Sequence, residues 1–459
     1  MSAAVRRGLG AAAAGALLAC LLPSSAAAQD GTYDVPWGFG VGHAEITIGP
    51  DGGGVRRLLM QPDGKPLLLG TCAGGPCFCA ARLQAHGQID TSFGGNQDGT
   101  AVFNLLRGEL ADAAALPGGS TVLVGTDHAS SAGLIARMTA TGFNDLSTTL
   151  RVRGLRTHVD AVAVQPDGKI LVGGDALADP DPHYSADTDF FVARLQSDFS
   201  LDPAFGDGGI ANVWFDLGAD RTDRFGALLL LPDGRIVLAG TAESDTGTWP
   251  VLARLLPSGQ LDAAFGSGGR QVFTLWSGAV ATVAAVARYP GDRIVLAGDV
   301  NGSTSRDMYV IRALSDGALD ASFGFFGYAP VAFDAGGDDA DFGRALAVQA
   351  DGRILVAGEV DTDVDTEHNF LGSLWGMARM RANGAYDPTF GNAGQATNAF
   401  AAPSDPAYAN EIASIVIDRG RLMVAGRGMH DYPSDLGPTR HFGVGRLRFE
   451  LIFADGLER

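Results

Sequence analysis

Short runs of apolar residues recur along most of the chain, and none is long enough for a helix of ordinary length. The runs are rich in Val, Ile, Leu and Ala, and several alternate large with small side chains, as β-strands do. Many are separated by Pro-Asp-Gly, whose residues suit a tight turn: Pro fixes φ, Asp bonds its own backbone and Gly accepts a positive φ. This pattern predicts an all-β protein made of short antiparallel strands.

The runs belong to a unit that occurs seven times. Residues 226–269 show its full form: two strands around Pro-Asp-Gly, a variable loop, a third strand, and the phrase LDAAFGSGG before a fourth strand. The phrase returns as LDPAFGDGG from Leu201, LDASFGFFG from Leu319 and YDPTFGNAG from Tyr386, and the first copy has IDTSFG. The second copy is degenerate, with Asn144-Asp145-Leu146 at this place. Each unit therefore predicts four antiparallel strands.

Seven four-stranded units predict a seven-bladed β-propeller, whereas a linear solenoid would need polar repeats at both ends. The seventh copy stops after its third strand and lacks the phrase. The segment WGFGVGHAEITI (37–48) precedes the first copy, and we match its Phe39-Gly40 to the Phe-Gly of the phrase. An N-terminal strand is thus expected to complete the last blade and close the ring.

The order of these motifs, LQPDGKILVAG followed by ARLxxxGxLDxxFG, resembles the delta-60 repeat family of secreted bacterial proteins. The match is specific in copies three to six, such as AVAVQPDGKILVGG with LDPAFGDGG at 161–209, and loose in copy two. The resemblance implies a propeller-like fold. It implies no particular activity, because the family has no general assigned one.

The N-terminus has the features of a secretory signal, which we place at residues 1–28: Arg6 and Arg7, an apolar stretch at 8–22 and the small residues 26–28. An alternative is a lipoprotein anchored through Cys20. No later run reaches the length of a transmembrane helix. We therefore expect an extracytoplasmic, periplasmic or secreted protein, with the propeller at 29–450 and a tail at 451–459 of unknown purpose.

The chain has 459 residues, a formal net charge of −19, 46% apolar residues and 19% charged residues. This composition argues against disorder, and the negative charge would repel nucleic acid. Motifs of metalloproteases, α/β-hydrolases, NTPases and dinucleotide-binding proteins are absent from the sequence. We predict no catalytic residues and leave open whether the protein is an enzyme.

The expected function is a monomeric binding or scaffolding module for an unknown protein or glycan. The alternatives are a calcium-stabilised cell-surface adhesin and a carbohydrate-active hydrolase or lyase whose carboxylate site the sequence does not reveal. Propellers host such activities on one fold, so the fold alone does not decide between them.

Blade topology predicts an acidic rim, because the loops after strand two and after strand four emerge on the same face. The acidic residues assigned to this rim include Asp127, Asp175, Asp189, Glu243, Glu359, Asp216, Asp223 and Asp341. Within it, DTDVDTE at 361–367 places Asp361, Asp363 and Asp365 at alternate positions, as a calcium loop does. Thr366 stands where a calcium loop has Gly, and no other cofactor is expected. A solvated loop is the alternative.

The repeated phrase itself predicts structure rather than chemistry. Its Phe should fill the wedge between neighbouring sheets, and its Asp should cap the turn through backbone N–H groups. These positions are Phe93, Phe205, Phe265, Phe323 and Phe390, and Asp90, Asp202, Asp262, Asp320 and Asp387.

Three cysteines, Cys72, Cys77 and Cys79, are close together in CAGGPCFC. In an oxidising compartment, Cys72 and Cys77 could close a small disulfide across a hairpin and leave Cys79 free. A metal site is the alternative, although it would need a fourth ligand from elsewhere in the chain.

Overall fold

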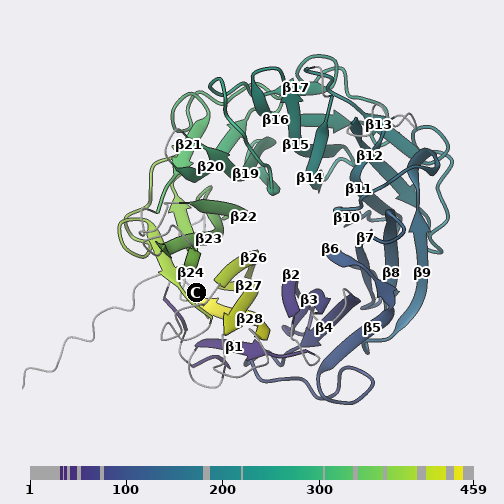
Figure 1. Cartoon of the computed structure of the whole chain (residues 1–459), viewed down its shortest axis with the longest axis vertical. Helices are drawn as coiled ribbons and strands as arrows, with labels where there is room; N and C mark the ends of the chain where they lie inside the picture. The colour runs from purple at the N-terminus through teal and green to yellow at the C-terminus, as the bar shows by residue number, and fades with distance from the viewer. Residues whose placement is uncertain are drawn as a thin grey trace, which may run out of the picture.

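Seven four-stranded antiparallel sheets surround a central axis in the computed structural model of the chain (Figure 1). The structure describes residues 32–34, 36–38, 42–48, 53–72, 77–178, 187–218, 221–302, 305–333, 340–364, 370–400, 410–430 and 439–447. These residues include one short 3-10 turn, η2 (Val152–Gly154), beside the strands. The predicted seven-bladed propeller is confirmed.

In blades one to six the strands follow chain order from the axis outward, and in blade seven the N-terminal strand takes the outermost place after the three C-terminal strands. The strands of blades one to three are β2 (Gly53–Met60), β3 (Pro66–Cys72), β4 (Cys77–Arg82) and β5 (Thr100–Arg107); β6 (Glu109–Ala115), β7 (Thr121–Asp127), β8 (Ala132–Met138) and β9 (Asn144–Leu150); β10 (Ala161–Val164), β11 (Ile170–Leu177), β12 (Thr188–Leu195) and β13 (Ile210–Val213). Blades four and five contain β14 (Asp223–Leu230), β15 (Ile236–Ser244), β16 (Gly247–Leu255) and β17 (Arg270–Val272); β18 (Ala285–Tyr289), β19 (Arg293–Asn301), β20 (Arg306–Ala313) and β21 (Tyr328–Val331). Blade six contains β22 (Asp341–Val348), β23 (Ile354–Val364), β24 (Phe370–Met380) and β25 (Gln395–Asn398), and blade seven contains β26 (Asn410–Asp418), β27 (Arg421–His430), β28 (Thr439–Leu447) and β1 (His43–Ile46).

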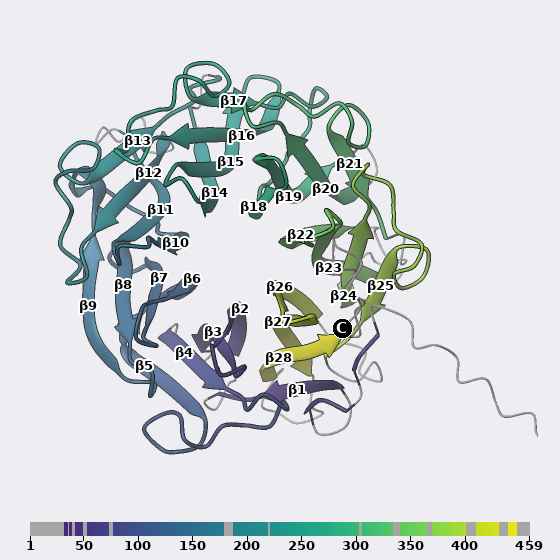
Figure 2. The same cartoon turned by 180° about the vertical axis from the view of Figure 1, so that it is seen from behind.

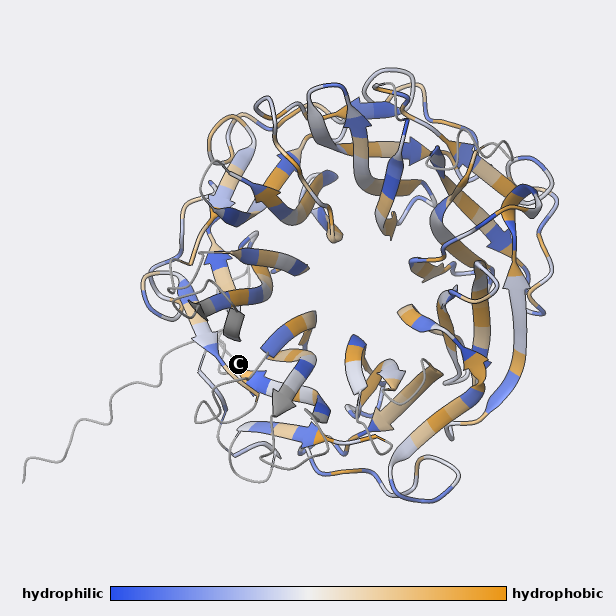
Figure 3. Ribbon diagram, in the orientation of Figure 1, coloured by the Kyte–Doolittle hydropathy of each residue, from blue (hydrophilic) through white to orange (hydrophobic). Residues whose placement is uncertain are grey.

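The middle strands of the blades are apolar on both sides because each sheet packs between two others. Every residue of β4 and of β12 is buried. Apolar clusters fill the space between neighbouring blades, and the hydropathy colouring shows apolar bands along these strands (Figure 3). This burial explains why the sequence shows short apolar runs rather than strict alternation.

The Pro-Asp-Gly turns adopt the conformation that their residues predict. Gly64 and Gly234 both have φ +83°, in the left-handed region that favours glycine. In the fifth copy Asp292 stands at this position, and it also has a positive φ, +56°. The irregular fifth turn therefore keeps the backbone path of the other copies.

The ring closes as predicted, because β1 pairs antiparallel with β28 (Figure 2). The match of Phe39-Gly40 to the repeated phrase is wrong, however. Asp34 and Trp37 take the places of Asp and Phe: Asp34 accepts a hydrogen bond from Arg446 Nε at 2.7 Å, and Trp37, 1% exposed, lies three residues after Asp34, as Phe93 lies after Asp90. The N-terminal YDVPWG is therefore the phrase that the seventh copy lacks.

The second blade keeps four strands without the phrase. Residue Asn144 already belongs to β9, so the chain passes from the third to the fourth strand through a short turn at residues 139–143. Phe143 is 54% exposed there, whereas the phrase Phe of the other blades is fully buried.

The described residues do not include the signal peptide at 1–28, the alternative anchor Cys20 or the tail at 451–459. Within the described ranges, no helix has the length and apolar character needed to span a membrane.

Candidate functional site

Each blade presents one extra residue to the axis, because every inner strand carries a β-bulge. The register of the inner strand shifts at this point in five blades. In the other two, Asp160 and Ala284 precede the strand and donate their backbone N–H to Gly173 and Ala297, which also pair with the next residue. A bulge turns a side chain away from its regular direction. The seven bulged residues are Arg56, Ala111, Asp160, Gly226, Ala284, Arg344 and Ala413.

All seven bulged residues line one cavity of about 400 Å³ on the propeller axis. Four of them are Ala or Gly, so the charged side chains Arg56, Asp160 and Arg344 stand apart from one another around the ring. The cavity lining also includes Arg57, Asp112 and Glu411. This cavity, which we call the axial chamber, is thus small and polar, and three of its seven bulged residues are charged.

The arginines of this chamber are engaged by carboxylates. Arg57 Nε lies 3.3 Å from Asp112 Oδ1, and Arg56 Nη1 lies 3.5 Å from Glu411 Oε1. Arg344 lies 3.9 Å from the buried Asp299. These pairs join neighbouring blades around the axis and neutralise the positive charge of the arginines.

Asp160 differs from these residues, because no described donor hydrogen-bonds to its carboxylate. Burial is the main cause that raises the pKa of Asp160 to about 7, and the negative charge of Asp175 adds to it. Beside it, His158 Nδ1 lies 3.3 Å from Asp175 Oδ1. This contact raises the pKa of His158.

A second cavity of about 370 Å³ continues from Asp160 toward the face opposite the Pro-Asp-Gly turns. Its lining includes Arg56, Glu109, His128, His158, Asp160 and Phe225. We define the channel mouth as this cavity together with the Asp160 end of the axial chamber. It combines the carboxylate of Asp160 with an arginine, an aromatic side chain and two imidazoles, each of which lies 3.3–3.6 Å from a carboxylate.

The opposite face of the blades contains a repeated ion network. The sequence predicted its Asp and Phe residues but not their arginine partners. In five blades an arginine of the third strand lies 2.7–2.9 Å from the phrase Asp and 4.5–4.9 Å above the phrase Phe. The arginines are Arg82, Arg194, Arg254, Arg312 and Arg379.

The Lys or Arg after Pro-Asp-Gly reaches the same carboxylate at 3.0–3.7 Å. In the third blade the hydrogen bond from Lys169 lowers the pKa of Asp202 to about 2. Each phrase Asp also accepts a backbone N–H two residues on, at 3.1–3.2 Å, and each phrase Phe is fully buried. Capping by Asp and packing by Phe are therefore confirmed. The sequence signal for the ion network was the arginine that stands eight residues before each Asp.

Some residues of the predicted acidic rim are buried. Asp223 and Asp341 are 1% and 3% exposed, and each accepts the backbone N–H of the preceding blade's last Phe, Phe215 or Phe333, at 2.7 Å. Burial raises the pKa of Asp223 to about 8. Asn410 Oδ1 accepts the backbone N–H of Phe400 at 2.9 Å in the same way. For Asp223 and Asp341 the assignment to an exposed rim is wrong, because these residues join consecutive blades.

The calcium candidates are only partly described. Asp361 and Asp363 belong to β23, which pairs with β24 through an irregular register, and Asp361 is 8% exposed. Asp365 lies outside the described residues. Among the residues that the structure does describe, no group of three His, Cys, Asp or Glu side chains is placed to hold a metal ion. Calcium binding by this segment stays a prediction.

The three cysteines are buried thiols at the end of the hairpin formed by β3 and β4. Cys72 pairs with Cys77 across the two strands, as the predicted disulfide requires, but the structure holds them as separate thiols. Together with Cys79 they are not arranged as a metal site, which removes that alternative for the described residues.

Five segments of the chain match the model of a domain of unknown function (DUF5122) beta-propeller. They are residues 61–93, 165–205, 231–265, 292–323 and 349–390. These matches support a β-propeller repeat family. Each matched segment runs from a Pro-Asp-Gly turn or its equivalent to the Phe of the phrase, so it contains the ion network described above. No curated protein sequence matches the chain.

Several solved propellers are similar to this chain in fold. One is catalytically inactive virginiamycin B lyase from Staphylococcus aureus with quinupristin, with 11% identity, a TM-score of 0.45 and coverage of 88% of this chain and 98% of that one. Another is the α-L-arabinofuranosidase Arb93A from Fusarium graminearum, with 12% identity, a TM-score of 0.41 and coverage of 73% and 93%. The β-propeller domain of the Trilobed protease from Pyrococcus furiosus has 10% identity, a TM-score of 0.41 and coverage of 88% and 97%.

His158 and Asp160 were missed in the sequence because they precede an inner strand and lie outside the loops that define the rim. Their signal was available in the alignment of the copies. At the bulge position four copies have Ala or Gly, whereas the third copy has Asp160.

Proposed function

We propose that this protein is an extracytoplasmic β-propeller binding module that takes the end of a glycan at the channel mouth. The observation that carries the proposal is the position of Asp160. Its carboxylate lines two connected cavities, and within the described part of the chain it accepts no hydrogen bond. A carboxylate in such a place can accept hydrogen bonds from sugar hydroxyls without first breaking a contact of its own.

The other side chains of the mouth suit the same ligand. Arg56 and His158 are donors, Glu109 is an acceptor, and Phe225 gives an apolar edge against which a sugar ring can pack. The pairing of Arg56 with Glu411 keeps the local charge close to neutral, which favours a polar, uncharged ligand over a strongly charged one.

The remaining expectations belong to the same proposal. The delta-60 resemblance and the N-terminal sequence support a secreted or periplasmic protein, and the sequence of residues 361–367 supports calcium as a stabilising ion. We infer a monomer, because the seven blades close a ring within one chain.

The test is a glycan array probed with the purified protein, followed by calorimetry with any retained glycan. We expect Asp160→Asn to weaken binding by about tenfold or more, since a hydrogen bond to a charged group contributes about 1.5–3 kcal/mol. Asp145→Asn, on the far face of the second blade, is the matched control and should bind as wild type does. An array with no retained glycan, or equal affinity of Asp160→Asn and wild type, would contradict the proposal.

A glycan-degrading enzyme is the second candidate, and it is favoured by the acid–base pair beside the cavity. Asp160, with a pKa of about 7, could donate a proton near neutral pH, and His158 is held by Asp175. Mass spectrometry of the retained glycans after incubation separates the two candidates. New reducing ends or unsaturated sugars that disappear in Asp160→Asn would identify an enzyme, and intact glycans would leave the binding module.

A further inference from the structure

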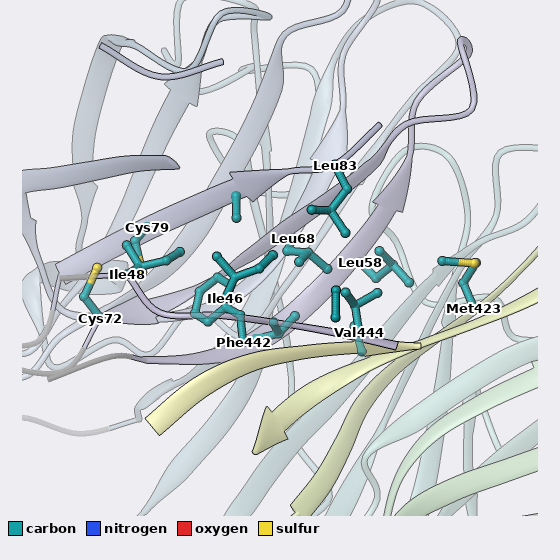
Figure 4. Close-up of a cluster of buried hydrophobic side chains, with 14 of the residues drawn as sticks. Ile46, Ile48, Leu58, Leu68, Cys72, Cys79, Leu83, Met423, Phe442 and Val444 are labelled. Carbon is teal, nitrogen blue, oxygen red and sulfur yellow. The ribbon is translucent and has the colours of Figure 1, made fainter. Parts of the chain in front are cut away.

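The three thiols of the first blade lie on one face of its sheet. Cys72 is directly opposite Cys77 in the register of β3 and β4, and Cys79 follows Cys77 by two residues, which returns its side chain to the same face. All three belong to the apolar cluster between the first and seventh blades. Figure 4 shows Cys72 and Cys79 beside Ile48 at one end of this cluster.

Cys79 has no side chain directly across from it on β3, because its partner there is Gly70. This glycine is required by close packing: a Cβ at Gly70 would lie 2.0 Å from the Gly54 carbonyl oxygen. The β3 side chains diagonal to Cys79 on this face are Leu68 and Cys72, and the thiol of Cys72 is hydrogen-bonded with that of Cys79. Cys72 faces one thiol directly and the other diagonally.

The electrostatics distinguish Cys72 from the other two thiols. Hydrogen bonding with Cys79 is the main cause that lowers the pKa of Cys72, and Cys77 contributes as well. Burial raises the pKa of Cys77 to about 12 and raises that of Cys79. Cys72 is thus the thiol that ionises first, and the thiolate is the reactive form.

Cys72 is 5% exposed and borders a cleft of the first blade. It lines this cleft, of about 100 Å³, together with Arg56, Arg427 and Glu411. The other two thiols do not line this cleft. A small disulfide entering it would meet Cys72 first.

We propose that Cys72, Cys77 and Cys79 form a thiol–disulfide exchange site, in which Cys72 is the shared partner of two alternative disulfides. The proposal goes beyond a fixed disulfide staple and does not depend on the glycan site. A staple needs two cysteines, whereas this hairpin places a third thiol within reach of the bond.

The chemistry balances with a small-molecule disulfide as the oxidant. The Cys72 thiolate attacks one sulfur of the oxidant, and a mixed disulfide forms as the first small thiol leaves. Cys77 then loses its proton and attacks Sγ of Cys72, which releases the second small thiol. Two protein thiols are oxidised by two electrons and the oxidant is reduced to two thiols. Cys79 can next attack Sγ of Cys72 and release Cys77 as a thiolate, with no net oxidation.

The experiment maps the disulfides of the purified chain after incubation with oxidised glutathione. Cys20→Ser is present throughout, which removes the cysteine outside the cluster. Free thiols are alkylated in acid denaturant, and chymotrypsin cleaves after Phe78, so that Cys77 and Cys79 fall on separate peptides for mass spectrometry.

We expect both pairings in wild type, Cys72–Cys77 in Cys79→Ser, and Cys72–Cys79 in Cys77→Ser. Cys72→Ser should contain at least tenfold less internal disulfide than either. Thermal unfolding of the reduced variants verifies that each is folded, and the wild-type map needs no variant. Two results would overturn the proposal: Cys77→Ser that stays reduced while wild type forms only Cys72–Cys77, or a Cys77–Cys79 bond in Cys72→Ser as abundant as the wild-type disulfides.

Discussion

The two faces of the propeller treat buried carboxylates differently. On the face of the repeated phrase, Asp262 lies near both Arg254 and Arg235 and accepts a backbone N–H. At the channel mouth, Asp160 lines two cavities and accepts no hydrogen bond from any described residue. The first arrangement recurs in five blades, and the second occurs at one bulge of seven. Repeated charge therefore stabilises the ring, and the charge that is available for a ligand lies at a position that does not repeat.

The largest expected effect comes from breaking the repeated network. Arg254→Ala leaves the carboxylate of Asp262 buried with a weaker partner and removes the cation above Phe265. Breaking a buried ion pair costs about 3–5 kcal/mol, and we expect a loss of this size in the free energy of unfolding, measured in urea.

Arg137→Ala is the matched control for Arg254→Ala. Arg137 lies 2.9 Å from Asp145, but their side chains are 30% and 40% exposed, and the second blade has no buried phrase Phe. Exposed pairs contribute about 0–1 kcal/mol. Equal losses for the two variants would show that the network is not what distinguishes the repeated blades.

A smaller loss is expected at the junction between blades six and seven. Asn410 is fully buried, accepts the N–H of Phe400 at 2.9 Å and donates to the carbonyl oxygen of Ser373 at 3.2 Å. Asn410→Ala leaves these backbone groups without their partner, which costs about 1–3 kcal/mol. The exposed Asn383 caps only its own turn, so Asn383→Ala should change the urea midpoint very little. A neutral Asn410→Ala would show that the hydrogen bonds of this side chain do not stabilise the junction.

The fold could be predicted from the sequence because each blade repeats the same local instructions. Pro-Asp-Gly predicts one turn, the phrase predicts another, and the apolar runs between them predict the strands. The number of copies therefore predicted the number of blades. The closure was predicted, but its phrase was placed at Phe39-Gly40, because Trp37 stands where the other copies have Phe.

The site could not be predicted in the same way. Whether an Asp is a cap, an ion-pair partner or a free acid depends on the neighbouring blade, tens of residues away. Asp223 begins an inner strand and Asp160 directly precedes one. Asp223 accepts the N–H of Phe215, whereas Asp160 lines the chamber. An alignment of the copies shows Arg56, Asp160 and Arg344 as exceptions among small residues. Only the strand register shows that these positions are bulges that face the axis.

The unpartnered state of Asp160 also predicts a dependence of stability on pH. Because its pKa is raised to about 7, the folded chain binds more protons at Asp160 than the unfolded chain does between pH 4 and 7. Stability from this group is therefore present at low pH and lost as the pH rises through 7.

We expect thermal unfolding of wild type and Asp160→Asn to diverge with pH. The wild type should lose about 1–2 kcal/mol relative to the variant between pH 5 and 8, a figure reduced for the partial exposure of Asp160. The comparison cancels the titration of Asp223 and Asp189, whose raised pKa values act in the same direction. It does not cancel that of His158, because the negative charge of Asp160 contributes to the raised pKa of His158. Parallel curves for the two proteins would mean that Asp160 titrates as an ordinary exposed carboxyl.

The smallest expected effect concerns calcium at Asp361, Asp363 and Asp365, whose carboxylates alternate along the sequence. An extracellular type of site binds calcium at about 0.1–1 mM, so 1 mM calcium should stabilise the fold by about 0.4–1.4 kcal/mol. The melting temperature should rise by a few degrees at most in calcium relative to chelator, and magnesium should not replace it. Asp363→Asn should abolish the rise, whereas Asp145→Asn should keep it. An unchanged transition of wild type in calcium and in chelator would leave this segment a solvated acidic loop, and Asp160 would then be the one carboxylate of that face with a proposed ligand.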